Sequence, residues 1–87
     1  MQWFVYVIHS DEGLNYVGMT KNIKRRIMQH NTGTNKWTRR GSGWKLIYHE
    51  SFDSTDEARA REKYFKNNAG REWLKRRGYL WSCLYLS

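Results

Sequence analysis

Proline is absent from this chain of 87 residues, and Cys83 is its only cysteine. A single cysteine excludes an intramolecular disulfide and argues against a thiolate zinc site, and both points favour a reducing compartment such as the cytoplasm. The apolar run from Trp3 to Ile8 is far shorter than a membrane span or the core of a signal peptide. These absences predict a cytoplasmic protein without a membrane partner.

Acidic residues are also scarce, with eight Asp and Glu against 16 Lys and Arg. The resulting net charge of +8 makes a polyanion the expected partner. Between Gly13 and His49 there are eight basic residues and no acid, whereas the basic set from Arg59 to Arg77 includes Glu62 and Glu72. This uneven distribution favours contact with a nucleic acid backbone, and a solvated basic surface without a partner is the plainer alternative.

The length allows one domain, expected to span residues 1–87, with a small core. Five Trp, six Tyr and three Phe supply large apolar areas for that core, and some of these rings could instead stack on bases.

Three segments have the composition of strands. Residues 3–8 are aromatic and β-branched, and the turn residues 10–13 separate them from a returning strand at 14–18. A third strand is expected at 44–52, with Trp44, Leu46, Tyr48 and Phe52 on one face and Ile47 and His49 on the other.

Helices are expected after two capping sequences. Residues 20–22 offer N-cap side chains before a helix whose inward stripe contains Ile23 and Ile27. Residues 54–57 match a capping box and open a second helix, in which Ala58, Glu62 and Phe65 share a face. A polar loop at 31–43, a break at 67–70, a short basic helix at 71–77 and an apolar terminal segment at 79–86 complete the pattern.

Five residues form a candidate catalytic set: Tyr6, Tyr16, Arg26, His30 and Glu62. Phenols, an imidazole, a guanidinium and a carboxylate are the groups needed to position a water, neutralise a phosphodiester and hold one hard metal ion. Arg26 and His30 are one helical turn apart and border the apolar stripe, so both should point toward the sheet.

Three of these residues also have a structural explanation. Tyr6 lies in an apolar strand and could be an ordinary core aromatic. Arg26 follows Arg25, and such pairs usually lie on solvated helix faces. Glu62 could simply pair with Lys66 four residues later.

Order and spacing give the set more weight. The segments Phe4-Val5-Tyr6 and Tyr16-Val17-Gly18, followed by Arg25-Arg26, Gln29-His30-Asn31 and residues 58–63, resemble the motifs of the GIY-YIG endonuclease family. The chain resembles the small single-domain bacterial type and is similar to the nuclease domain of excision-repair and homing endonucleases, which suggests a link to DNA repair.

The resemblance implies an α/β fold, a three-stranded antiparallel sheet flanked by helices, and metal-dependent hydrolysis of DNA. It also implies that both tyrosines line the site, that His30 assists one of them or the water, and that Glu62 alone binds a single Mg²⁺ or Mn²⁺. Many members carry a later Asn, but the corresponding positions here hold Leu74 or Arg77.

We expect the basic loop residues to contact phosphates of DNA, including branched or single-stranded forms, with Trp37 packing or stacking. The predicted nucleic-acid contacts are Lys21, Arg25, Lys36, Trp37, Arg39, Arg40 and Lys45. Two alternatives stay open: a module that binds DNA or RNA without cutting it, and a nuclease subunit whose protein partner supplies specificity.

Overall fold

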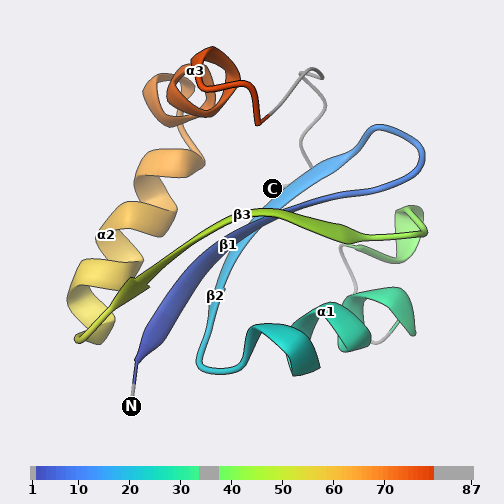
Figure 1. Cartoon of the computed structure of the whole chain (residues 1–87), viewed down its shortest axis with the longest axis horizontal. Helices are drawn as coiled ribbons and strands as arrows, with labels where there is room; N and C mark the ends of the chain where they lie inside the picture. The colour runs from blue at the N-terminus through green and yellow to red at the C-terminus, as the bar shows by residue number, and fades with distance from the viewer. Residues whose placement is uncertain (1, 34–37, 80–87) are drawn as a thin grey trace.

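The computed structural model describes residues 2–33 and 38–79. Three antiparallel strands form one sheet in the order β2-β1-β3, from β1 (Trp3–His9), β2 (Asn15–Thr20) and β3 (Lys45–Phe52). The helices are α1 (Ile23–Asn31), α2 (Thr55–Phe65) and α3 (Asn68–Arg76), with a short 3-10 helix η1 (Thr38–Arg40) before β3. Figure 1 shows α1 and α2 on opposite sides of the sheet. The predicted fold class is therefore confirmed.

The β1–β2 hairpin sets the register of the sheet. Gly13 has a φ of 90°, a conformation that glycine adopts without strain, and the Ser10 amide donates to the Leu14 carbonyl at 2.9 Å. Tyr6 then pairs with Gly18, and Tyr16 pairs with the residue two positions after Tyr6. Because side chains alternate along a strand, this register places both tyrosines on one face of the sheet.

Each face of the sheet has its own apolar cluster. On one face Val5, Val7 and Val17 pack with side chains from α2 and α3, namely Ala58, Phe65 and Leu74. On the other face, which α1 covers, Tyr6, Ile8, Tyr16 and Trp44 form a second cluster together with Ile27. Burial on both faces explains why β1 is apolar throughout its centre.

The predicted faces of β3 are wrong because the strand contains a bulge. Val7 pairs with Tyr48, while the next residue of β1 pairs with Leu46, so Ile47 is the extra residue. Leu46 therefore lies on the α1 face and Tyr48 on the α2 face, where Ile47 also packs. His49 pairs with Tyr6 and so lies on the opposite face from Ile47.

The starts of α1 and α2 follow the predicted capping chemistry, and α3 has a similar cap that was not predicted. The side chains of Asn22, Ser54 and Asn67 accept the amides of Arg25, Glu57 and Gly70, respectively. The cap at Asn67 starts α3 three residues before the predicted helix at 71–77, so most of the expected break is helical. Most of the predicted terminal strand lies outside the described residues. Within the described parts of the chain, no helix is long and apolar enough to span a membrane.

Candidate active site

Tyr6 and Tyr16 lie side by side on the face of the sheet covered by α1. Tyr6 is 1% exposed and Tyr16 9%, and their ring centroids are 6.4 Å apart. Tyr16 also lies over the imidazole of His30, with 5.0 Å between the ring centroids. The structure thus brings both tyrosines and His30 together, as the sequence predicted.

His30 sits in the last turn of α1 and is 1% exposed. Its Nε2 lies 2.8 Å from the Tyr6 hydroxyl and its Nδ1 lies 2.7 Å from the Thr38 hydroxyl. Burial and the nearby positive charge of Arg26 lower the pKa of His30 to about 4. The imidazole is therefore neutral at pH 7, with a polar partner on each nitrogen.

Arg26 lies one turn before His30 and is half-buried. Burial raises the pKa of Tyr6 to about 12, while a hydrogen bond from Arg26 opposes this rise. The guanidinium also donates to Gln29 at 3.2 Å, and its Nε is buried without a hydrogen-bond partner among the described residues. A cation with an unused donor is suited to bind an incoming phosphate.

Gly18 provides the space that the Tyr6 side chain occupies. A Cβ atom at this position would lie 2.5 Å from the Tyr6 hydroxyl oxygen and 3.1 Å from the Tyr16 ring. Real Cβ atoms do not come so close to another heavy atom, so a larger residue would displace the phenol. Gly18 is therefore required by close packing in the candidate site.

Glu62 lies on α2, the helix that covers the opposite face of the sheet. Its side chain is 18% exposed and its carboxylate forms an ion pair with Lys66 at 3.5 Å. The charge of Glu62 contributes to the raised pKa of Tyr6. No hydrogen bond or ion pair among the described residues joins Glu62 to Tyr6, Tyr16, Arg26 or His30. Its direct partner is Lys66, as in the structural alternative given above.

The contacts that Thr38 and Trp44 make with the end of α1 were not predicted from the sequence. Asn31 binds both backbone groups of Trp44, accepting its amide at 2.7 Å and donating to its carbonyl at 3.1 Å. The Trp44 indole donates to the Thr38 carbonyl at 2.9 Å, and Thr38 is fully buried against His30. A Thr in a basic polar loop carries no sequence signal for such a position, since surface loops are rich in threonine.

The predicted nucleic-acid contacts fall into several groups. Lys21 and Arg25 are exposed and line a cleft of about 250 Å³ with Arg26 and three uncharged residues, Thr20, Asn22 and Gln29. Lys21 also lies over the Trp3 ring, 5.0 Å from its centroid. Arg39 and Arg40 are exposed on η1. Lys36 and Trp37 lie outside the described residues.

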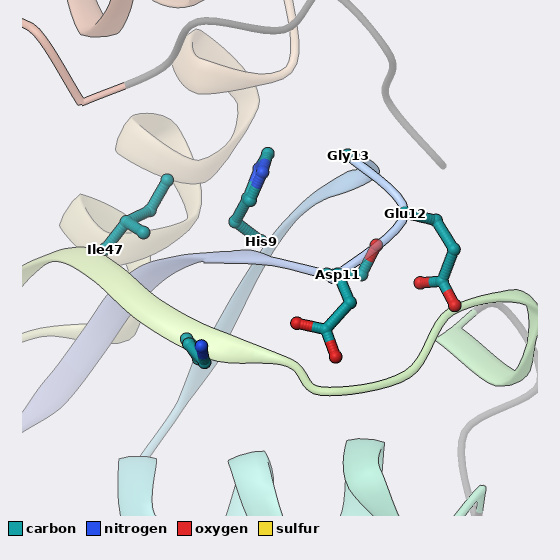
Figure 2. A pocket seen from close by; sticks show the side chains of 7 residues that line it. His9, Asp11, Glu12, Gly13 and Ile47 are labelled. Carbon is teal, nitrogen blue, oxygen red and sulfur yellow. The ribbon is translucent and has the colours of Figure 1, made fainter.

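Lys45 lies in a different environment, a pocket of about 430 Å³ at the β1–β2 turn. Figure 2 shows the carboxylates of Asp11 and Glu12 at one end of this pocket and the side chains of His9 and Ile47 at the other. The two acids offset the charge of the lysine. Lys45 is therefore less suited to bind phosphate than the residues of the Lys21 cleft.

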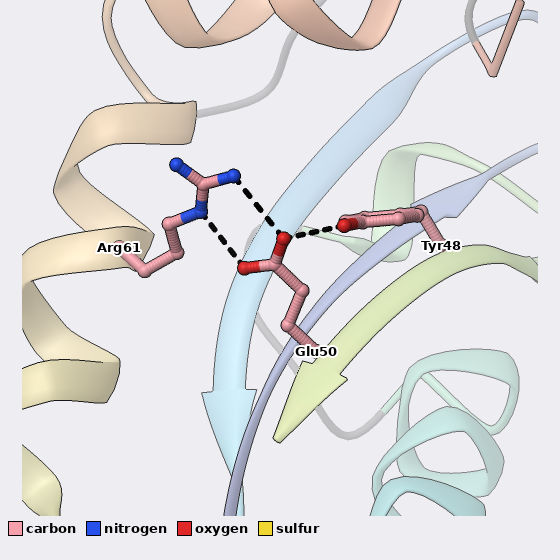
Figure 3. Close-up of polar contacts among 3 residues, drawn as sticks. All are labelled: Tyr48, Glu50 and Arg61. Atoms are coloured by element: carbon pink, nitrogen blue, oxygen red, sulfur yellow. Dashed lines mark hydrogen bonds and ion pairs between the residues drawn. The ribbon is translucent and has the colours of Figure 1, made fainter. Parts of the chain in front are cut away.

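The Arg61–Glu50 ion pair has a structural role. Arg61 of α2 forms two hydrogen bonds with Glu50 of β3, at 2.8 and 3.1 Å, and Tyr48 donates to the same carboxylate (Figure 3). Although burial opposes the shift, these contacts lower the pKa of Glu50. The guanidinium also stacks on Phe65. The Arg61–Glu50 pair therefore fastens α2 to the sheet on the face opposite Tyr6 and Tyr16.

Comparison with known proteins adds an independent line of evidence. The family model described as the GIY-YIG catalytic domain matches residues 2–77. The chain is 42% identical to a UPF0213 protein of Streptococcus agalactiae serotype V over 72% of this chain and 73% of that protein. It is 39% identical to a UPF0213 protein of Clostridium perfringens over 72% of this chain and 69% of that one.

A solved structure agrees with these relatives. The solution structure of the UPF0213 protein from Bacillus halodurans superposes with a TM-score of 0.55 and 30% identity, covering 90% of this chain and 86% of that one. The chain therefore belongs to the GIY-YIG family, and this membership implies a nuclease-type function on nucleic acid.

Proposed function

We propose that the protein is a metal-dependent DNA endonuclease that hydrolyses phosphodiester bonds on the α1 face of the sheet. The observation that carries this proposal is the buried hydrogen bond of 2.8 Å between the Tyr6 hydroxyl and Nε2 of His30, beside Arg26 and Tyr16. A phenol bonded to a neutral imidazole is a route for a proton, and the nearby guanidinium offers a site for the phosphate.

The pKa shifts restrict how the proton moves. Because the pKa of Tyr6 is about 12, this residue is a neutral phenol at pH 7. As the water attacks phosphorus, its proton passes to the Tyr6 oxygen while the phenol proton passes to Nε2 of His30. The P–O bond to the leaving oxygen breaks as the new bond forms, the leaving oxygen keeps the bonding electron pair and takes a proton from solvent water, and the imidazolium then releases its proton to solvent. The approaching phosphate charge favours the protonated imidazole and so assists the transfer.

Arg26 supplies charge where the reaction needs it. Its unused Nε can donate to a nonbridging phosphate oxygen, and the adjoining cleft lined by Lys21 and Arg25 extends the positive surface away from the tyrosines. Such contacts bind the backbone without reading base sequence. Tyr16 shares the face with Tyr6 and is placed to contact the same phosphate or water.

Glu62 is the residue that would hold the divalent ion. In the described parts of the chain no group of three or more His, Cys, Asp or Glu side chains could hold a metal. One half-buried carboxylate still fits Mg²⁺ or Mn²⁺, since Mg²⁺ usually keeps several waters and takes one or two carboxylates together with substrate phosphates. When bound, the ion would offset negative charge on the phosphate.

The direct test is to incubate purified protein with supercoiled, branched and single-stranded DNA, with and without Mg²⁺ or Mn²⁺. We expect metal-dependent cleavage of at least one form, and loss of cleavage in Tyr6→Phe with retained binding. The matched control is Tyr64→Phe, which removes a tyrosine hydroxyl outside the site. Binding without metal-dependent cleavage of any form would favour a module that binds nucleic acid without cutting it.

A further inference from the structure

Thr38 contacts the imidazole nitrogen that faces away from Tyr6. Its hydroxyl lies 2.7 Å from Nδ1 of His30, and both side chains are almost fully buried. Hydrogen positions follow from counting donors and acceptors in this buried group. The count begins at the Tyr6 hydroxyl, which carries one proton and accepts through its oxygen.

Arginine can only donate, so Arg26 contacts the lone pairs of the Tyr6 oxygen. The Tyr6 proton then needs an acceptor, because Tyr6 is 1% exposed and a buried hydroxyl without an acceptor is costly. Among the described residues the structure gives it Nε2 of His30. If Nε2 carried a hydrogen, two donors would face the oxygen and the phenol proton would have no acceptor.

Nε2 is therefore the nitrogen with the lone pair, and the single hydrogen of the neutral imidazole resides on Nδ1. The group that faces Nδ1 is the Thr38 hydroxyl, which can accept this hydrogen. We propose that Thr38 is a positioning residue that fixes His30 in the Nδ1–H tautomer, with the Nε2 lone pair directed at the Tyr6 hydroxyl. This inference rests on the proposed function, in which Nε2 accepts the phenol proton.

The surroundings of Thr38 hold its backbone in place. Its carbonyl accepts the Trp44 indole N–H at 2.9 Å and the Gly41 amide at 3.1 Å. Trp44 is held in turn by two hydrogen bonds with Asn31, the residue after His30. The end of α1 and the segment that carries Thr38 are thus linked at several points, so the hydroxyl keeps a fixed position relative to the ring.

The test uses Thr38→Val, which keeps the shape and the backbone contacts but removes the hydroxyl, and Thr38→Ser, which restores it. The tautomer is read from the imidazole ¹⁵N chemical shifts, with the His30 signals assigned by their loss in His30→Gln. We expect Nδ1–H in the wild type and in Thr38→Ser, and a mixed or Nε2–H state in Thr38→Val.

In cleavage assays we expect kcat of Thr38→Val to fall about 10- to 100-fold with little change in KM, and Thr38→Ser to recover most of it. The spectra need no activity, so absence of cleavage in the wild type would contradict the proposed function alone. An Nε2–H imidazole in the wild type, or an unchanged tautomer in folded Thr38→Val, would overturn the role of Thr38.

Discussion

The Tyr6 hydroxyl and Nε2 of His30 lie 2.8 Å apart across the interface between the central strand and α1. These two residues are 24 positions apart in the chain, so only the folded sheet and helix bring them together. Their contact couples a phenol whose pKa is raised with an imidazole whose pKa is lowered. Both shifts keep the pair neutral until a charged substrate arrives.

Removal of either proton carrier should slow cleavage strongly without unfolding the protein. We expect Tyr6→Phe and His30→Gln each to lower kcat by about 10²- to 10⁴-fold, the usual contribution of a positioned acid or base. The double variant should be little worse than either single one, because both act in one proton path. Independent, multiplicative losses in quenched-flow or gel assays would contradict the shared path.

Glu62→Gln and Arg26→Ala should separate metal binding from phosphate binding. Glu62→Gln keeps the size of the side chain but removes its charge, so Mn²⁺ affinity and cleavage should fall while DNA binding persists or tightens slightly. Arg26→Ala should lose cleavage and weaken DNA binding. Matched controls are Glu72→Gln and Arg59→Ala, which change exposed residues.

Equal loss of DNA binding in both site variants would indicate misfolding, which circular dichroism would reveal. Unchanged Mn²⁺ affinity in Glu62→Gln, measured by electron paramagnetic resonance, would exclude this carboxylate as the metal ligand.

DNA affinity should depend strongly on salt and weakly on sequence. If about five basic side chains contact phosphates, log affinity should fall against log salt with a slope of about −4 to −5. Changing Lys21 or Arg25 to Gln should reduce the slope by about 1 each. We expect Lys45→Gln to have a smaller effect, because Asp11 and Glu12 share its pocket. Fluorescence anisotropy at several salt concentrations measures all three, and equal slopes throughout would contradict the assignment of the cleft.

The neutral, buried state of His30 should make stability depend on pH. Its pKa is about 4 in the folded protein against 6.5 for an ordinary histidine. The unfolded chain therefore takes up the proton first, and the free energy of unfolding should fall as the pH decreases from about 6.5 to about 4. Urea titrations of wild type and His30→Gln test this, since the variant should show a smaller decrease over that window. Equal slopes would contradict it.

Gly18→Ala should destabilise the protein and impair cleavage. The added methyl group would lie 2.5 Å from the Tyr6 hydroxyl oxygen and 2.7 Å from the adjoining ring carbon. Overpacking of this kind costs about 1–3 kcal/mol. Because Tyr6→Phe removes one of the two clashing atoms, the double variant should be more stable than the sum of the single effects predicts. Strict additivity in thermal unfolding would exclude a direct clash.

Sequence reasoning predicted the architecture because the local signals agreed with one another. The β-branched run of β1, the turn at Gly13 and the caps at Asn22 and Ser54 each specify a local structure. The family resemblance also implied that both tyrosines line one site, although the register that pairs Tyr6 with Gly18 and Ile8 with Tyr16 was not readable. Alternation then placed both rings on one face.

Features that depend on long-range contacts could not be predicted. The bulge at Ile47 leaves the composition of β3 unchanged, so alternation alone assigned Tyr48 to the wrong face. The contact of Thr38 with His30 depends on how the end of α1 packs against the segment that carries Thr38. These outcomes reflect tertiary structure rather than local propensity.

The extra residue in β3 has a consequence for how this chain can vary. Before Ile47 the chain places Trp44, the residue that precedes β3, on the α1 side, where its indole binds the Thr38 carbonyl. After Ile47 the strand places Tyr48 on the α2 side. Loss or gain of one residue here would exchange the faces on which Trp44 and Tyr48 lie and would break the contact between Trp44 and Thr38. A change of side chain at Ile47 would leave both placements intact. In related chains we therefore expect substitutions in this strand to be tolerated better than insertions or deletions.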